Sequence, residues 1–378
     1  MVRAMNRASL LFGLLSSLAL AACGSATAPS TPAASSAPAG SAAAKPAPAS
    51  SAASASAKPA TSAGAAASPA ASGLTTLKVA HAPSTLFAPR YIAIDKGYMK
   101  QQGIDVSLTT VTAGQDAQAF LATGQLDAAV AGIAAATFNA VNQGLDIRIV
   151  GSMGAAPANA DPSALMVRAD ELDSGAVKSL AGLKGKKVAL SGGVGAAGSF
   201  YMAQLLAKDN LKLSDIEVIN LSFPDIVAGF KGKSIDASIV PAPFTTVILK
   251  EGSAKVPDFG HLIAGVSGTG TVYGQHLLRQ DRQLGQRFFN GLIRGAADVQ
   301  GDKARDPQNL DILAKATKLP VATLKTMALY TFKPDLAPDT ATYNNMQQVF
   351  IQAGVLKFPQ PLPTDKIVDG VFSKNAKP

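Results

Sequence analysis

The sequence has no tryptophan, one cysteine and three histidines among its 378 residues. A single cysteine excludes an internal disulfide and any multi-cysteine metal site. The histidines are scattered and form no HxxxH, HExxH or Cys/His cluster. No GxSxG sequence occurs, and no Ser/His/Asp set stands out. We therefore expect no metal, no cofactor and no catalysis.

The excess of positive charge is also small, with 34 Lys and Arg against 25 Asp and Glu. No run of basic residues interleaved with aromatics occurs, so nucleic acid is not an expected partner. After Leu20 no apolar run reaches about 18 residues, and we expect no further membrane span.

The only cysteine, Cys23, follows an export signal. A short basic start precedes the apolar run 10–20, which is too short to span a bilayer comfortably. The stretch Leu20-Ala21-Ala22-Cys23 resembles the bacterial lipobox. This resemblance implies that residues 1–22 are removed as a signal peptide and that the thiol of Cys23 carries diacylglycerol. The alternative is an ordinary signal peptide with an incidental cysteine.

Residues 23–73 are almost entirely Ala, Ser, Pro, Thr and Gly, with Lys45 and Lys58 as the only charged side chains. Such a segment has too few apolar side chains to bury a core. We predict a disordered tether between a membrane anchor and a globular body.

The body begins with alternating strand and helix patterns. Strands are expected over 77–80, 104–111 and 126–132, helices over 91–102 and 115–123, and a loop over 83–89. This β-α-β-α-β order predicts an α/β fold with largely parallel sheets and right-handed crossovers.

The same order returns after residue 185, and the hexapeptides 125–130 and 234–239 are alike. Their aspartates, Asp127 and Asp236, are interpreted as residues that begin strands rather than as chemical groups.

Helices are expected over 281–299, 307–317, 321–330 and 339–352, and a last one within 363–372. We predict a first lobe from 74–162 and 263–378, and a second lobe from 163–262. Crossings near 162–167 and 266–275 would form a hinge beside a ligand cleft.

Five segments in order carry a resemblance to a known family: YIAIDKGYMKQQGIDVSL, Gly114, ATGQLDAAVAG, LKGKKVALSGGVG and SIDASIVPAP. They resemble the solute-binding proteins of ABC importers, within the nitrate/sulfonate/taurine and thiamine-pyrimidine-precursor (SsuA/THI5-like) group. The resemblance covers residues 77–375. It implies the two-lobed type II periplasmic-binding-protein fold, with a ligand in the hinge cleft.

A glycine-rich loop in the second half is the first candidate site. Residues 193–198 match GxGxxG between a strand and a helix, but the next strand ends without an acid, which disfavours a dinucleotide. Unpaired N–H groups at the helix start would favour a negative or acceptor group. In the family this loop contacts ligand, which implies binding by Ser191, Gly192, Gly193, Val194 and Gly195. The alternative is a tight strand-to-helix turn.

The ends of strands in the first lobe supply the other candidates, because ligands of open parallel sheets bind there. They are Ser84, Thr85, Phe87, Gly114, Gln115, Asp116, Gly132 and Ile133. Asp116 could instead stabilise a helix start, and His81 could be a strand-end polar residue or a ligand contact. Pro243 matches the family's proline after the last strand of the second lobe. The missing Trp, and loops without arginine except Arg90, argue against sulfonate, nitrate or another fully charged anion.

These features favour an extracytoplasmic, lipid-anchored solute-binding protein, on the periplasmic side or at the cell surface. It would act as a monomer, bind one small polar or aromatic solute and deliver it to an ABC permease and its ATPase. One alternative is a ligand-sensing surface lipoprotein. Another is an enzyme on the same fold, similar to the pyrimidine synthases, although the only cysteine here lies in the lipobox.

Overall fold

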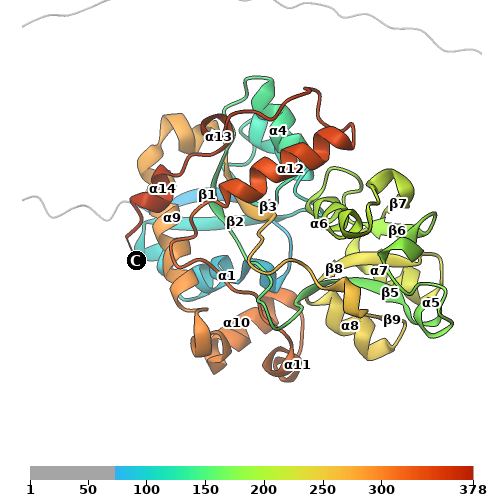
Figure 1. Cartoon of the computed structure of the whole chain (residues 1–378). Helices are drawn as coiled ribbons and strands as arrows, with labels where there is room; N and C mark the ends of the chain where they lie inside the picture. The colour runs from blue at the N-terminus through green and yellow to red at the C-terminus, as the bar shows by residue number, and fades with distance from the viewer. Residues whose placement is uncertain (1–72, 378) are drawn as a thin grey trace, which may run out of the picture. The chain divides into compact units, whose positions relative to one another are not determined.

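The computed structural model describes residues 73–377, so Cys23 and nearly all of the predicted tether lie outside the described residues. The described chain forms two lobes, each built on a five-stranded sheet flanked by helices (Figure 1). Among residues 73–377, no helix is long and apolar enough to cross a membrane.

The first lobe combines the two ends of the described chain. Its strands are β1 (Thr75–His81), β2 (Ile104–Thr110), β3 (Ala128–Gly132), β4 (Arg148–Ser152) and β10 (Thr269–Tyr273). Its helices and helical turns are η1 (Thr85–Phe87), α1 (Ala88–Asp95), α2 (Tyr98–Gln101), α3 (Asp116–Ala122), α4 (Ala135–Asn142), η6 (His276–Gln280), α9 (Arg282–Ala297), η7 (Gly301–Arg305), α10 (Pro307–Thr317), α11 (Val321–Thr326), α12 (Thr340–Gln352), α13 (Thr364–Ile367) and α14 (Val371–Lys374).

The second lobe is continuous in sequence and is drawn in green to yellow in Figure 1. Its strands are β5 (Ser163–Arg168), β6 (Lys187–Leu190), β7 (Glu217–Asn220), β8 (Ala237–Pro241) and β9 (Ala254–Lys255). Its helices and helical turns are α5 (Ala169–Asp173), η2 (Leu180–Leu183), α6 (Ala197–Leu206), η3 (Ala207–Asp209), η4 (Leu213–Asp215), α7 (Phe223–Lys231), α8 (Phe244–Glu251) and η5 (Asp258–Gly260).

The two sheets have equivalent strand orders, β2-β1-β3-β10-β4 and β7-β6-β8-β5-β9. In each sheet one strand, β10 or β5, runs antiparallel to its neighbours. These two are the first strands after the chain passes between lobes. The predicted α/β two-lobed fold is confirmed, and its sheets are mixed rather than wholly parallel.

The predicted crossings are displaced. Residues 162–167 and 266–275 mostly form β5 and β10, so the connecting segments are 153–162 and 261–268. The reason lies in burial, since all five residues of β10 and five of the six in β5 are buried. Burial of nearly every residue is typical of a central strand, not of a hinge.

Some helices begin or end at other residues than the sequence predicts, in part because of a proline and a glycine. The expected loop 83–89 contains η1 and the start of α1, because Pro89 occupies the first turn of α1, where its missing N–H costs nothing. The expected helix 91–102 is divided at Gly97, which has a φ of 76°. The expected helices 321–330 and 363–372 are also shorter: α11 ends at Thr326, and α13 and α14 are separate turns.

The central strands of both sheets are buried on both faces. Along β1, Val79 belongs to the core shared with α1 and α9, whereas Ala80 belongs to the core shared with α3, α4 and α12. In the second lobe, Leu190 packs with α6 on one face and Ala189 with α7 and α8 on the other. Such double-sided burial accounts for the near-continuous apolar strands in the sequence.

Asp127 and Asp236 have matching structural roles at the starts of equivalent strands. Asp127 accepts a hydrogen bond from the N–H of Lys78 at 2.7 Å, and Asp236 accepts one from the N–H of Lys187 at 2.9 Å. The other carboxylate oxygen of Asp127 lies 2.6 Å from His276 Nδ1, and that of Asp236 lies 3.0 Å from the Arg168 guanidinium. Neither aspartate lines the cleft described below. Their interpretation as strand-starting residues is confirmed.

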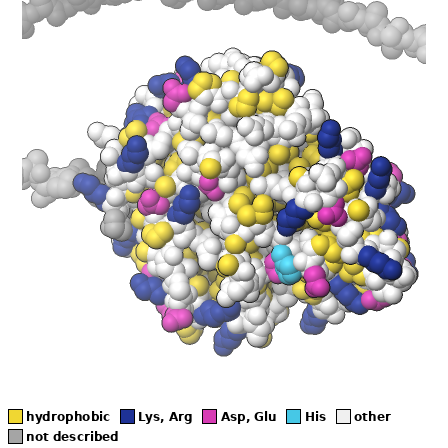
Figure 2. All heavy atoms as spheres, in the orientation of Figure 1, with side chains coloured by type: hydrophobic (Ala, Val, Ile, Leu, Met, Phe, Trp, Pro, Cys, Tyr) yellow, Lys and Arg dark blue, Asp and Glu magenta, His cyan; other side chains and the backbone are white. Residues whose placement is uncertain are grey.

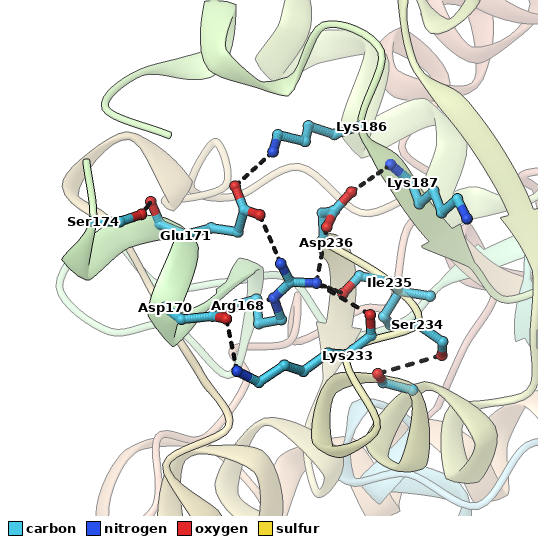
Figure 3. Close-up of polar contacts among 11 residues, drawn as sticks. Arg168, Asp170, Glu171, Ser174, Lys186, Lys187, Lys233, Ser234, Ile235 and Asp236 are labelled. Carbon is cyan, nitrogen blue, oxygen red and sulfur yellow. Dashed lines mark hydrogen bonds and ion pairs between the residues drawn. The ribbon is translucent and has the colours of Figure 1, made fainter. Parts of the chain in front are cut away.

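Arg168, the last residue of β5, is the centre of a network of ion pairs in the second lobe (Figure 3). Its guanidinium lies 2.6 Å from Asp170 and Glu171 and 3.0 Å from Asp236, and Lys186 also pairs with Glu171. The side chain of Arg168 is 14% exposed. One cation thus ties α5 and β5 to the start of β8.

We expect Arg168→Met to lower the free energy of unfolding by about 2 kcal/mol, because it leaves partly buried carboxylates without their cation. The matched control is Lys255→Met, which breaks an exposed pair with Asp173 and is expected to cost less than about 0.5 kcal/mol. Urea unfolding followed by circular dichroism measures both. Equal losses would show that the network adds no more than a surface ion pair.

Candidate functional site: a cleft between the lobes

A cavity with a volume of about 380 Å³ lies between the lobes. Its walls are the carboxyl ends of β1, β2 and β3 in the first lobe and of β6, β7 and β8 in the second. This is where open α/β sheets bind ligands, because strand ends and helix starts leave backbone groups accessible there. The start of α6 completes the second wall.

The lining residues include no Lys, Arg, Asp, Glu or His. Most of the wall is apolar, and hydroxyls from Thr110, Thr112, Ser191 and Ser222 are among the polar groups in it. Charged side chains are instead spread over the outer surface, and on the face shown in Figure 2 several basic ones lie beside acidic ones. The cleft therefore suits an uncharged ligand with a substantial apolar body.

Aromatic side chains line both walls. Phe87 belongs to the first lobe, whereas Tyr201, Phe223 and Phe244 belong to the second. The rings of Phe223 and Phe244 stack with centroids 5.2 Å apart and an interplanar angle of 23°. A pre-stacked pair of this kind offers a flat surface to an aromatic or planar ligand.

Unused hydrogen-bonding groups gather at the start of α6. Ser191 is 8% exposed, and its hydroxyl has no hydrogen-bond partner among the described residues. The backbone N–H groups of Ala197 and Gly198 likewise donate to no acceptor in the described chain. All three residues line the cleft. Buried polar groups are normally paired, so these positions point to a polar group on the ligand.

The glycine loop before α6 uses its N–H groups internally. The N–H of Gly192 donates to Asn220, that of Gly193 to the carbonyl of Leu190, and that of Gly195 to Ser199. The expectation of unpaired N–H groups therefore holds at the helix start but not at Gly192, Gly193 and Gly195. The unpaired N–H groups lie further along, in the first turn of the helix.

The same loop joins the lobes. The carbonyl of Gly195 accepts a hydrogen bond from the N–H of Ala135 at the start of α4, at 2.7 Å. A Cβ atom at Gly192 would lie 3.0 Å from the Cβ of Ala113. Gly114 allows a close approach within the first lobe, because a Cβ there would lie 1.8 Å from the carbonyl oxygen of Gly132.

A second set of inter-lobe contacts lies at the crossings. The hydroxyl of Ser84 donates to the carbonyl of Ala242, and that of Tyr330 donates to the carbonyl of Pro162 at 2.9 Å. Tyr330 also accepts from the N–H of Ala242 and lies 2.6 Å from the Ser163 hydroxyl. Ser84 accepts from Leu86 as well, so its hydroxyl is already engaged in the architecture.

Five of the predicted site residues line the cleft: Ser84, Phe87, Gly114, Gly132 and Ser191. The other nine do not: Thr85, Gln115, Asp116, Ile133, Gly192, Gly193, Val194, Gly195 and Pro243. Asp116 accepts from the N–H of Ala113, and Ile133 is wholly buried in the core. Pro243 precedes α8 as its N-cap residue. A ligand contact for any of the fourteen stays a prediction.

Sequence reasoning missed the residues at the carboxyl ends of β2 and β7. Thr110 to Ala113 and Ser222 to Pro224 line the cleft because the carboxyl ends of parallel strands meet at one edge. That rule could have found them from the predicted strands. Ser163 and Thr269 had no such signal, since each begins an antiparallel strand whose place in the sheet depends on the crossings.

Arg90 and His81 form an unexpected polar group behind the first wall. Arg90 is wholly buried, and its guanidinium lies 3.3 Å from His81 Nδ1 and 3.3 Å from the carbonyl of Val130. Burial, and secondly the charge of Arg90, lowers the pKa of His81 to about 4. His81 is therefore neutral at pH 7, which the sequence did not indicate.

Comparison with known proteins places this geometry in a family. The NMT1/THI5-like family profile matches residues 84–302. A search of curated proteins finds no match. The alkanesulfonate-binding protein SsuA from Xanthomonas axonopodis pv. citri, bound to MOPS, is similar in structure. It is 18% identical, with a TM-score of 0.61, and the match covers 79% of this chain and 99% of that one.

Two further structures show the range of proteins that share the fold. The periplasmic nitrate-binding protein NrtA from Synechocystis PCC 6803 is 14% identical with a TM-score of 0.64, over 80% of this chain and 88% of that one. A mutant of DszB in complex with biphenyl-2-sulfinic acid is 15% identical with a TM-score of 0.52, over 79% and 98%. Because the family profile spans more than half of the sequence, the chain belongs to the NMT1/THI5-like family.

Proposed function

We propose that this protein is the extracytoplasmic solute-binding component of an ABC importer. The observation that carries the proposal is the cleft, whose walls come from both lobes and in which the buried hydroxyl of Ser191 and the N–H groups of the first turn of α6 have no partner in the described chain. Two similar sheets joined by short crossings suit closure around a solute. The binding proteins of known structure that share the fold support this role. The captured solute would pass to a permease and its ATPase.

The solute we propose is small and uncharged, with an aromatic or apolar body. No charged side chain lines the cleft, so an anion would lose its hydration without gaining a direct ion pair. The stacked rings of Phe223 and Phe244 fit a planar group. The binding of biphenyl-2-sulfinic acid by DszB shows that this fold accommodates an aromatic ligand.

The test is direct identification of the solute. Native mass spectrometry of the purified protein should reveal a retained molecule, and a thermal-shift screen of neutral aromatic metabolites should find stabilisers. A ligand at 100 times its Kd adds about 2.7 kcal/mol of stability. Small-angle scattering should show compaction with that ligand. Stabilisation by charged sulfonates alone would contradict the proposed solute class.

Membrane anchoring is proposed through Cys23. We expect the wild-type chain to partition into detergent phase and Cys23→Ser to remain in the aqueous phase or unprocessed, because two or more acyl chains are needed for stable anchoring. Globomycin-type inhibition of lipoprotein processing gives an independent control. Identical partitioning of the two proteins would exclude the lipid anchor.

An enzyme on the same fold is the second candidate, because DszB is a desulfurization enzyme. The only cysteine of this chain is Cys23, outside the described residues, so the cleft holds no thiol nucleophile. The identified solute decides the matter: recovery of the unchanged molecule after prolonged incubation supports binding alone. Uptake of the same solute by cells, lost when the gene is deleted, distinguishes import from sensing.

A further inference from the structure

Arg90 is buried without an acidic partner. Its side chain has no exposed surface, and no carboxylate of the described chain lies within ion-pair distance. The guanidinium packs over the ring of Tyr91, 4.2 Å from its centroid, and 5.7 Å from that of Phe87. Its Nε atom has no partner among the described residues. A buried cation is costly, so its contacts with neighbouring groups are informative.

The contact with His81 fixes the tautomer of that imidazole. A guanidinium has only donors, so the Arg90 nitrogen 3.3 Å from His81 Nδ1 requires Nδ1 to accept. The Tyr91 hydroxyl also lies 3.3 Å from Nδ1, but it donates to the carbonyl of Ala82. A neutral imidazole that accepts at Nδ1 carries its hydrogen on Nε2.

The fixed tautomer determines what Thr110 can do. His81 Nε2 lies 3.2 Å from Thr110 Oγ1, and it must donate, since Nε2 carries the hydrogen. Thr110 Oγ1 then accepts this bond, and its own hydrogen remains for another acceptor. Thr110 lines the cleft, where that acceptor would belong to a bound molecule.

We propose that Arg90 and His81 are positioning residues that make the Thr110 hydroxyl a hydrogen-bond donor to the solute. The solute then carries an uncharged acceptor, such as a carbonyl oxygen, beside its aromatic or apolar body. This inference rests on the proposed function. It adds that the first-lobe wall binds a hydrogen-bond acceptor of the solute. The positive charge of Arg90 behind Phe87 favours the same polarity, because it attracts the negative end of a carbonyl dipole.

The tautomer is measured without any solute. In the full-length chain labelled with ¹⁵N-histidine, long-range ¹H–¹⁵N correlation spectra at pH 7 should show His81 neutral with its hydrogen on Nε2. The chain has three histidines, and the signals lost in His81→Leu identify this one. In Arg90→Met the Nδ1–H or the charged form should appear. A wild-type His81 that is charged, or that carries its hydrogen on Nδ1, overturns the proposal.

Solute polarity is tested with acetophenone and α-methylstyrene, which have nearly the same shape but differ in the carbonyl oxygen. We expect the wild-type protein to bind acetophenone about fivefold to tenfold more tightly, the usual value of one hydrogen bond. Thr110→Val should remove this preference. His81→Leu should weaken it, whereas His81→Gln should retain it, because the Gln amide N–H can replace Nε2–H. Circular dichroism and melting curves verify that each variant is folded.

The outcomes separate the two proposals. Equal binding of the two probes by the wild type, or tighter binding of benzoate than of acetophenone, overturns the inference about Thr110 while leaving a binding cleft. If the wild type binds none of the three probes, the proposed solute class fails, and the tautomer spectrum alone decides whether Arg90 and His81 position Thr110. A preference that survives in Thr110→Val also overturns the inference.

Discussion

The Gly198→Phe substitution is expected to abolish solute binding with little change in stability. Gly198 is the second residue of α6 and lines the cleft. A Cβ atom there would meet only Leu190, at 3.8 Å, apart from the helix itself. A large side chain can therefore extend into the cavity of about 380 Å³ and occupy the space of the solute. Phenylalanine also has a better helix propensity than glycine, which offsets small losses elsewhere.

Isothermal titration with the solute found in the screen measures this effect, and we expect at least a 100-fold loss of affinity, about 2.7 kcal/mol. Gly198→Ala is the matched control and should bind almost normally. Gly193→Ala is the second control: Gly193 has a φ of 66° and faces Asn220. It should lose about 1 kcal/mol of stability but keep its affinity. Wild-type affinity in Gly198→Phe would place the site elsewhere.

The Gly295→Ala substitution is expected to destabilise the first lobe strongly, although it adds only one methyl group. Gly295 lies on α9, where a Cβ atom would be 2.0 Å from the carbonyl oxygen of Pro89 and 3.1 Å from the Cβ of Ala93. Both belong to α1, so the two helices would have to separate. Overpacking against a backbone cannot be relieved by a rotamer change, and we expect a loss of about 3 kcal/mol or more.

Gly291→Ala, one turn earlier on the same helix, is the control for this effect. Its Cβ would lie 2.5 Å from the sulfur of Met99, the flexible end of an adaptable side chain. Both substitutions gain the same helix propensity, so the difference between them isolates the packing of α1 against α9. Chemical unfolding should show a loss below about 1 kcal/mol for Gly291→Ala. Equal losses would mean that α1 moves away from α9 without strain.

Local sequence patterns were sufficient for most elements. A short apolar run located β1, alternation located β2 and the segment LDAAVAG located β3, and the helix predicted over 307–317 coincides with α10. Prediction was poorer where one residue interrupts a pattern, as at Gly97, because the propensity of its neighbours still favours helix. The crossings were misplaced because a buried antiparallel strand and a linker differ in their surroundings, not in their local periodicity.

The sequence likewise predicted only part of the candidate site. The sequence located the strand ends, and with them Ser84, Phe87, Gly114, Gly132 and Ser191, since parallel strands bring their carboxyl ends together. It placed the unpaired N–H groups in the glycine loop, where the fold instead uses them for internal bonds to Asn220 and Ser199.

By itself, then, the sequence determined the α/β class and the two similar lobes, because these follow from the order and periodicity of apolar residues. It indicated the family through the resemblance of five segments to known proteins, which the family profile confirms. The tertiary structure alone decided which groups remain without partners in the cleft. Whether Ser191 is unpaired, or Arg90 lies against His81, depends on hydrogen bonds between residues far apart in sequence or on different elements. Such pairing is a property of the folded neighbourhood, and no local pattern encodes it.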